Sequence, residues 1–508
     1  MNMKEAGTDI KNTIEIYLKK DEFGDYRIPL VRQRPIFLLG APGIGKTAVV
    51  EQIAQELHLA LVSYSMTHHT RQSALGLPFI QQKCYGGVTY DVSEYTMSEI
   101  IASVYDAMEE SGLREGILFL DEINCVSETL APAMLQFLQY KVFGRHRVPE
   151  GWVIVTAGNP PMYNKSVREF DVVTMDRLKV MEVEPDFDVW KEYALEHGIH
   201  NAIVTFLELK KDCFYRMETT GKGRSYVTAR GWEDFSQIIT LYEENHWKVD
   251  EALAGQYLRN DEIVREFCVY YDLYRKYQKD YQVTEILGGN VSQTVLKKAQ
   301  AADFDERLSL LGLLLEQVRN GMREVVITGE YLQELMPLLR SLKQTQEIPQ
   351  RLGQLVEARE KLLHSLEAAN SLSKVEKTKH RRIIRFLLQT QRSVITESCR
   401  KPDSTMEEME RQQSAFEVVK EKFDAEVAGL RESAAGVDGQ AASLFAFVEA
   451  AFGQGNEMLV LVTELTVDQY SSRYVARYGC EAYQKYSEVL MLDERQNRMR
   501  EDIKKLEL

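Results

Sequence analysis

Residues 35–57 join a short apolar run, a glycine-rich loop and an amphipathic segment, and this combination constrains the fold more than any other part of the chain. The run from Pro35 to Leu39 has the apolar character of a buried parallel strand. The loop after it reads GAPGIGKT and matches the pattern G-x-x-x-x-G-K-[ST]. The apolar side chains that follow have helical spacing: Val49, Ile53, Ala54 and Leu57. Strand, loop and helix in this order predict an α/β domain with a phosphate-binding loop.

Each type of residue in this loop has a physical role in binding phosphate. Glycines allow backbone N–H groups to turn inward, and the amino end of the following helix adds further donors. Lys46 is expected to reach the β- and γ-phosphates, and the Thr47 hydroxyl to ligate Mg²⁺. The predicted nucleotide contacts are Gly40, Ala41, Pro42, Gly43, Ile44, Gly45, Lys46, Thr47 and Ala48. The alternative, a glycine-rich turn with a chance lysine, leaves the flanking strand and helix unexplained.

A second apolar run ends in two adjacent acids. Gly116 to Leu120 predicts a buried strand, and Asp121 and Glu122 stand at its carboxyl end, where ligands bind in open α/β sheets. Asp121 is expected to bind the nucleotide by holding Mg²⁺ through its water shell. Glu122 is expected to polarise an attacking water as general base. A purely structural role is the weaker interpretation, because paired acids pack poorly at the end of a buried strand.

A third predicted strand, Trp152 to Ala157, ends in Gly-Asn-Pro-Pro. A polar side chain at such a strand tip can hydrogen-bond the attacking water beside the γ-phosphate, which gives Asn159 a catalytic role. The alternative is a simple turn, because Asn-Pro commonly ends a strand. Its place as the third element in order favours the catalytic interpretation of Asn159.

Taken in order, GAPGIGKT, ILFLDEIN, VIVTAGNPP and MDRL resemble the motifs of AAA+ ATPases, and more narrowly of the MoxR-type and dynein-related branch, the helix-2-insert clade. The resemblance covers about residues 30 to 290. It implies an α/β P-loop core, a parallel sheet flanked by helices, followed by an α-helical lid. It also implies ATP hydrolysis, a ring that is usually a hexamer, and remodelling of a partner protein.

The resemblance gives a role to Arg177, which lies about twenty residues past Asn159. The family has an Asp-Arg-Phe motif at this place, and Leu178 here replaces the Phe. Such an arginine is a finger that serves the nucleotide of a neighbouring subunit. Arg168 is the competing candidate, and a surface pair with Asp176 is the plain alternative.

A second arginine, Arg230, stands where the family carries the sensor arginine of the lid. Thr228 and Ala229 replace the usual Ser-Pro start of that helix, and Thr228 is a suitable helix cap. Such an arginine would bind the γ-phosphate and couple it to the lid. Arg224 is the competing candidate, and a salt bridge at the rim is the alternative role.

Residues 77–82 and 88–92 read as two extended segments around Tyr85-Gly86-Gly87 and predict a β-hairpin. It falls where the clade has its helix-2 insert, before a helix expected from Met97 to Met108. In the family such loops face the pore or the substrate, and a plain surface hairpin is the alternative. His68 and His69 lie nearby, but adjacent residues of a strand point to opposite faces, so no metal site is expected.

Residues 291–508 lack strand signals and are rich in Glu, Gln, Lys and Leu. Apolar residues at near-heptad spacing predict an all-helical bundle or an antiparallel coiled coil, with a helix start at Pro402-Asp403-Ser404 and a second break at 436–439. The basic residues between Lys374 and Arg385 would bind an acidic partner or nucleic acid, or form a solvated helical face. The predicted domains are a core at 1–185, a lid at 186–290 and a partner-binding helical region at 291–508.

Composition limits the class of partner and the cellular compartment that we expect for this chain. The net charge of −15 argues against nucleic acid as the main partner. No run approaches the length of a membrane span, and no secretory leader is visible. Single cysteines without CxxC pairs predict reduced thiols in a cytoplasm: Cys84, Cys125, Cys213, Cys268, Cys399 and Cys480.

The leading hypothesis is a cytoplasmic, Mg²⁺-dependent ATPase that forms a homo-oligomeric ring and remodels or assembles a partner protein. The chain has no D-x-S-x-S metal-adhesion motif, so a partner with a von Willebrand factor A domain would act in trans. Two alternatives stay open: a nucleic-acid motor of the same clade, and an ATP-binding scaffold with little turnover.

Overall fold

The computed structural model describes residues 1–68, 74, 76–163, 167–220, 223–345, 347–400 and 408–488. The chain forms two compact units. The first comprises Met1–Val189, Thr228–Arg230 and Glu357–Arg381, and the second comprises Trp190–Val227, Gly231–Val356 and the described residues from Arg382 on. Most helices of the predicted lid and of the predicted C-terminal region thus share one unit, and the division into three domains stays a prediction.

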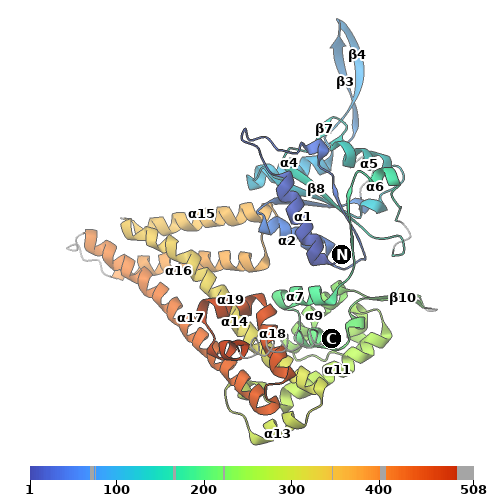
Figure 1. Ribbon diagram of the computed structural model, residues 1–508. Helices are drawn as coiled ribbons and strands as arrows, with labels where there is room; N and C mark the ends of the chain where they lie inside the picture. Colours follow the sequence, from blue (N-terminus) through green and yellow to red (C-terminus); the bar gives the residue numbers. More distant parts are fainter. Residues whose placement is uncertain are drawn as a thin grey trace, which may run out of the picture. The chain divides into compact units, whose positions relative to one another are not determined.

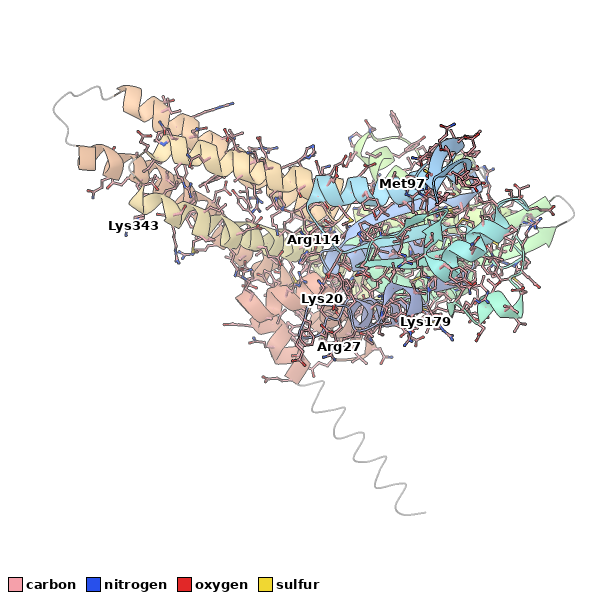
Figure 2. The ribbon with its side chains drawn as sticks, turned by 90° about the horizontal axis from the view of Figure 1, so that it is seen from above. Lys20, Arg27, Met97, Arg114, Lys179 and Lys343 are labelled. Atoms are coloured by element: carbon pink, nitrogen blue, oxygen red, sulfur yellow. The ribbon has the colours of Figure 1, made fainter. Side chains whose placement is uncertain are left out.

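The first unit is built on a five-stranded parallel sheet, as expected for an α/β P-loop core. In spatial order the strands are β2 (Ala60–Ser65), β5 (Gly116–Asp121), β8 (Trp152–Gly158), β1 (Ile36–Gly40) and β9 (Lys179–Val183). Figure 2 labels Arg114, just before β5, and Lys179, at the first residue of β9. Both residues lie at the amino ends of strands. The phosphate loop and the acids lie at the other end of the sheet, where the carboxyl ends of the strands are.

Alternate residues of each strand face two separate cores, because successive side chains of a strand point to opposite faces. Ile36 and Leu38 pack with helices α1 and α2, whereas Phe37 packs with helices α4 and α5. The sheet is therefore buried on both faces, which explains why its strands read as continuous apolar runs. The described α-helices that lie entirely within this unit are α1 (Met3–Tyr17), α2 (Lys46–Glu56), α4 (Glu99–Ser111), α5 (Ala131–Tyr140) and α6 (Val172–Met175).

The predicted hairpin is formed by β3 (Pro78–Tyr85) and β4 (Val88–Tyr95), which pair antiparallel and project from the core (Figure 1). Gly86 and Gly87 connect the strands with φ of 60° and 86°. A two-residue turn with both φ values positive matches the twist of the strands and favours glycine. A smaller hairpin, β6 (Val142–Phe143) with β7 (His146–Arg147), follows α5.

The described residues of the second unit form helices and their connections, apart from the hairpin of β10 (Arg216–Thr220) and β11 (Gly223–Val227). Its lid helices are α7 (Phe187–His197), α8 (Asn201–Leu209), α9 (Ala229–Glu244), α10 (Glu251–Tyr257), α11 (Asp261–Asp280) and α12 (Val283–Leu287). Then follow α13 (Gln293–Ala301), α14 (Phe304–Arg340), α15 (Ile348–Ala368), α16 (Lys374–Arg400), α17 (Glu408–Phe452), α18 (Asn456–Val467) and α19 (Gln469–Tyr478). The facing ends of α15 and α16, within residues 357–381, belong to the first unit. The predicted all-helical region is confirmed.

The predicted break at 436–439 is wrong, because α17 continues through both glycines. The predicted helix start at Pro402-Asp403-Ser404 lies outside the described residues. Helices of the predicted lid pack against the later helices through a partly buried charge cluster. Lys191 of α7 pairs with Glu464 of α18, and Arg319 of α14 donates to the same carboxylate. Among the described helices, none combines the length and apolar character needed to cross a membrane.

Candidate functional site

Three adjacent strands bring the predicted motifs to one edge of the sheet. The order β5–β8–β1 places Asp121, Asn159 and the loop from Gly40 at neighbouring carboxyl ends. Residues that are separated by 113 positions in sequence, Lys46 and Asn159, are within hydrogen-bonding distance. The strand order thus turns three separate sequence motifs into one cluster of polar groups.

The glycine-rich loop has the backbone shape that its sequence predicts. Gly43 and Gly45 adopt positive φ values of 73° and 95°, which other residues rarely adopt. Gly45 is the residue before α2, so the loop leads directly into a helix amino end. This arrangement of glycine turns and free helical N–H groups is the kind that binds phosphate.

Lys46 is buried and makes three hydrogen bonds within the loop region. Its Nζ donates to the carbonyls of Gly40 (2.9 Å) and Ala41 (2.8 Å) and to Asn159 Oδ1 (2.9 Å). Burial, assisted by the nearby Arg230 charge and opposed by Asp121 and Glu122, lowers the pKa of Lys46 to about 8. An anionic ligand beside Lys46 would favour its charged form and so raise this pKa.

Thr47 and Asp121 supply the oxygen ligands that Mg²⁺ prefers. The Thr47 hydroxyl donates to Asp121 Oδ2 at 3.3 Å, so a neutral oxygen and a carboxylate converge beside the phosphate loop. Mg²⁺ is bound in proteins by few protein oxygens together with waters and phosphate oxygens. The donor set therefore fits the magnesium site predicted from the sequence.

Glu122 has an unusual backbone conformation and a fixed side chain. Its φ is 54°, in the left-handed region that non-glycine residues rarely adopt, and its N–H donates to Asp121 Oδ1 at 2.8 Å. The hydroxyls of Ser65 and Thr67 donate to Glu122 Oε2 at 3.2 Å and 3.1 Å. Strained residues of this kind cluster at functional sites.

Asn159 is held by a buried asparagine that follows the acidic pair. Asn124 Nδ2 donates to the Asn159 carbonyl at 2.8 Å, and the Asn124 side chain packs against Gly158. A Cβ at residue 158 would come within 2.5 Å of Asn124 Oδ1, so only glycine permits this approach. The loop carrying Asn159 is thereby fixed beside β5.

Arg177 and Arg168 differ in their surroundings. Arg177 is exposed in the short connection between α6 and β9, and no described residue forms an ion pair with its guanidinium. Its neighbour Leu178 is 3% exposed and belongs to the core beneath the sheet, which anchors this connection. Arg168, in contrast, forms an ion pair with Glu128.

Arg230 lies beside the phosphate loop. Its backbone N–H donates to the Gly43 carbonyl at 3.1 Å, and a Cβ at residue 43 would lie 3.0 Å from Thr228. Arg224 lies in β11 and belongs to the second unit. Of the two competing candidates, Arg230 therefore has a position beside the phosphate loop.

Sequence reasoning missed Ser65, Thr67 and Asn124. Ser65 ends β2, which pairs with β5 so that Ser65 lies opposite Asp121. A hydroxyl at the end of the preceding strand is the only sequence signal, and it becomes useful once that pairing is known. The side chains of His68 and His69 lie outside the described residues.

Two residues of the basic cluster at 374–385 form ion pairs with acids. Lys377 pairs with Glu367, and Arg382 pairs with Glu426. Arg382 also stacks over the Tyr331 ring at 4.3 Å. These partly exposed ion pairs fit the alternative interpretation of this segment as a solvated helical face.

Comparison with known proteins identifies one domain. Residues 36–174 match the model of the ATPase family associated with various cellular activities (AAA). The matched range contains the phosphate loop, both acids and Asn159. The match supports an ATPase domain of the AAA+ class, and domains of this class bind ATP. A search among curated proteins gave no match to the chain.

Proposed function

We propose that this chain is a Mg²⁺-dependent ATPase that hydrolyses ATP at the edge of the sheet formed by β5, β8 and β1. The observation that carries the proposal is the convergence of Lys46, Asp121 and Glu122 with Asn159, within a segment that matches the AAA model. A structural ion-pair network would pair these groups among themselves. Among the described residues, Lys46 instead donates to neutral oxygens, and the acids accept from hydroxyls and a backbone amide.

Each residue has a defined role in this proposal. The loop N–H groups and Lys46 bind the phosphates, while Thr47 and Asp121 hold Mg²⁺, which when bound neutralises phosphate charge. Glu122 takes a proton from the attacking water, and Asn159 orients that water. Lys46 and Asn159 are already hydrogen-bonded to each other at 2.9 Å, so γ-phosphate and water would be bound side by side.

Ring assembly and partner remodelling extend the proposal. AAA+ proteins commonly form rings, and an exposed Arg177 is available to the nucleotide of a neighbouring subunit. The antiparallel hairpin of β3 and β4, placed between β2 and α4, supports assignment to the MoxR-type, helix-2-insert branch. A hexamer, a cytoplasmic location and a chaperone-like role on a partner, such as one with a von Willebrand factor A domain, follow from that branch.

The proposal is tested by measuring Mg²⁺-dependent ATP turnover and ATP binding separately. Lys46→Ala removes the phosphate-binding cation and should weaken both. Glu122→Gln removes the base and should lower turnover about 10²-fold or more while ATP still binds. Matched substitutions at exposed positions, Lys19→Ala and Glu99→Gln, should leave both unchanged. Full turnover in both site variants would show that this edge of the sheet is not the hydrolysis site.

A further inference from the structure

The turn between α15 and α16 is unusually well defined for a connection between two helices. Asn370 has a φ of 50°, and the N–H groups of Asn370 and Ser371 donate to the carbonyls of Glu367 and Leu366. This pattern of bonds is the Schellman motif that ends many helices. On the other side, Ser373 and Glu376 exchange hydrogen bonds as a capping box. We call residues 365–377 the elbow.

The elbow belongs to the first unit and contacts the outer edge of its sheet. β2 is an edge strand, and the N–H of Leu61 donates to the Ala369 carbonyl at 2.9 Å. Ala369 is 1% exposed within the core that α4 and β2 share, and Ser365 Oγ donates to the Ser111 carbonyl at the end of α4 at 2.7 Å. Figure 1 shows the α15–α16 turn beside this core.

The Ala369 carbonyl and the Leu61 N–H would each lack a hydrogen-bond partner without the other. The last carbonyls of a helix have no partner within the helix, and alternate N–H groups of an edge strand have none within the sheet. Their pairing gives the elbow a fixed position on β2. A buried hydrogen bond of this kind, together with the buried Ala369 side chain, costs free energy to break.

The far end of β2 bears directly on hydrolysis. Ser65 is the last residue of β2, four positions after Leu61, and its hydroxyl and that of Thr67 hold the Glu122 carboxylate. A strand is a stiff element, so its position at Leu61 sets its position at Ser65. Nothing else among the described elements pairs with this outer edge of β2.

We infer that the elbow is a positioning element for the general base: by bonding the edge of β2 at Leu61, Ala369 holds Ser65 and Thr67 where they fix Glu122. This inference rests on the ATP hydrolysis proposed above. The elbow joins α15 and α16, whose ends next to it belong to the first unit and whose far ends belong to the second. A segment far along the chain from the phosphate loop, but within the same compact unit, thereby helps to position the general base.

The experiment uses the full-length protein and the substitution Ala369→Glu, which puts a charged side chain into a buried site and displaces the elbow. Ala358→Glu is the matched control, because Ala358 is exposed on the same helix α15. Ala369→Gly adds neither charge nor volume at the buried site and is the conservative variant. Ser365→Ala, which removes only the bond to Ser111, tests the same contact with a smaller disturbance of folding.

Two measurements report separate steps. Hydrogen exchange at the Leu61 amide should accelerate in Ala369→Glu and not in the control, because Ala369 supplies its acceptor. ATP turnover should show kcat lowered about tenfold, with the KM for ATP little changed, since misplaced catalytic groups slow the chemical step while the phosphate loop is intact. In Ala369→Gly the exchange rate at Leu61 and kcat should both stay near those of the unmodified protein. Ser365→Ala should change both in the same direction as Ala369→Glu, but by less.

A double-mutant cycle tests whether the elbow acts on Glu122 through Ser65 and Thr67. In a Ser65→Ala, Thr67→Val background, Ala369→Glu should no longer change kcat, because the link to Glu122 is already cut. An unchanged kcat in Ala369→Glu despite faster exchange at Leu61 would overturn the inference, as would a full additional loss in that background. If the unmodified protein shows no turnover above Lys46→Ala, the proposed function itself fails, whereas exchange at Leu61 still reports whether the elbow is docked.

Discussion

A lysine outside the proposed site, Lys141, is the least expected residue of the core. It is 2% exposed, adopts a φ of 58° at the end of α5, and donates its Nζ to the Leu138 carbonyl without an acidic partner among the described residues. Burial lowers the pKa of Lys141 to about 7 from its usual 10.5. Below pH 7 the folded protein therefore contains a buried charge, which is unfavourable.

The pH dependence of stability follows from this shift. Between pH 7 and 10.5 the unfolded chain keeps the Lys141 proton and the folded chain does not, so stability rises with pH by up to about 1.4 kcal/mol per unit. Lys141→Met keeps the unbranched side chain, one atom shorter, without the charge. We expect it to raise the melting temperature most at or below pH 7, with the gain shrinking toward pH 9. An equal gain at every pH, or the same profile in Lys19→Met, would contradict this assignment.

The sequence predicted the residues whose chemistry is local, and not those whose role depends on strand pairing. The phosphate loop was predictable because glycine positions, lysine and helix are adjacent in the chain, and Asp121 because it ends an apolar run. Ser65 was not, since its relation to Glu122 exists only because β2 pairs with β5. Lys141 was not, since nothing in its neighbours signals burial.

At the scale of elements, α17 shows how packing overrides a local signal. Gly436 and Gly439 predicted a break, because each glycine in a helix interior costs about 1 kcal/mol relative to alanine. The helix instead runs for 45 residues, from Glu408 to Phe452. Val437 and Leu444 are buried on one face of it, and this packing outweighs the propensity cost. The hairpin at Gly86-Gly87 was predicted correctly, since there the local glycine preference and the fold agree.

The same helix gives a stability prediction. A Cβ at Gly436 or Gly439 would meet no atom within 4 Å, so Gly436→Ala and Gly439→Ala should each stabilise the second unit by about 0.5–1 kcal/mol. Gly321→Ala in α14 should instead destabilise it, because its Cβ would lie 2.8 Å from Val437. Urea unfolding monitored by helical circular dichroism checks the order of the three variants. Loss of stability in both α17 variants would argue against a continuous helix.

At the scale of the whole molecule, each compact unit is built from several separate segments of the chain. The predicted lid and the later helices share a core in which α8 packs against α14, and Gly312 of α14 lies against Thr205 of α8. These contacts join segments more than a hundred residues apart, which neither apolar spacing nor motif order reports. Conversely, residues 357–381, which include the elbow, belong to the same compact unit as Met1–Val189 although they are distant from it in sequence. Long-range pairing of this kind is set by the complete set of apolar surfaces and not by any single stretch.

The ring proposed for this protein makes its own prediction at Arg177. The Arg177 guanidinium is exposed, while Leu178 beside it is anchored in the core, so the arginine is held in place and available to another copy of the chain. Arg177→Ala should still bind ATP but hydrolyse it poorly, by about 10³-fold if a finger in trans is lost.

Mixing this variant with Lys46→Ala protein is the decisive measurement, because each variant alone is expected to have little turnover. At mixed interfaces a subunit with an intact Lys46 receives Arg177 from its Lys46→Ala neighbour, so part of the turnover should return in proportion to such interfaces. Arg168→Ala serves as the comparison, since Arg168 is bound to Glu128 and should need no rescue. If mixed oligomers form and no turnover returns, Arg177 acts only as a surface residue, and the ring loses its link to hydrolysis.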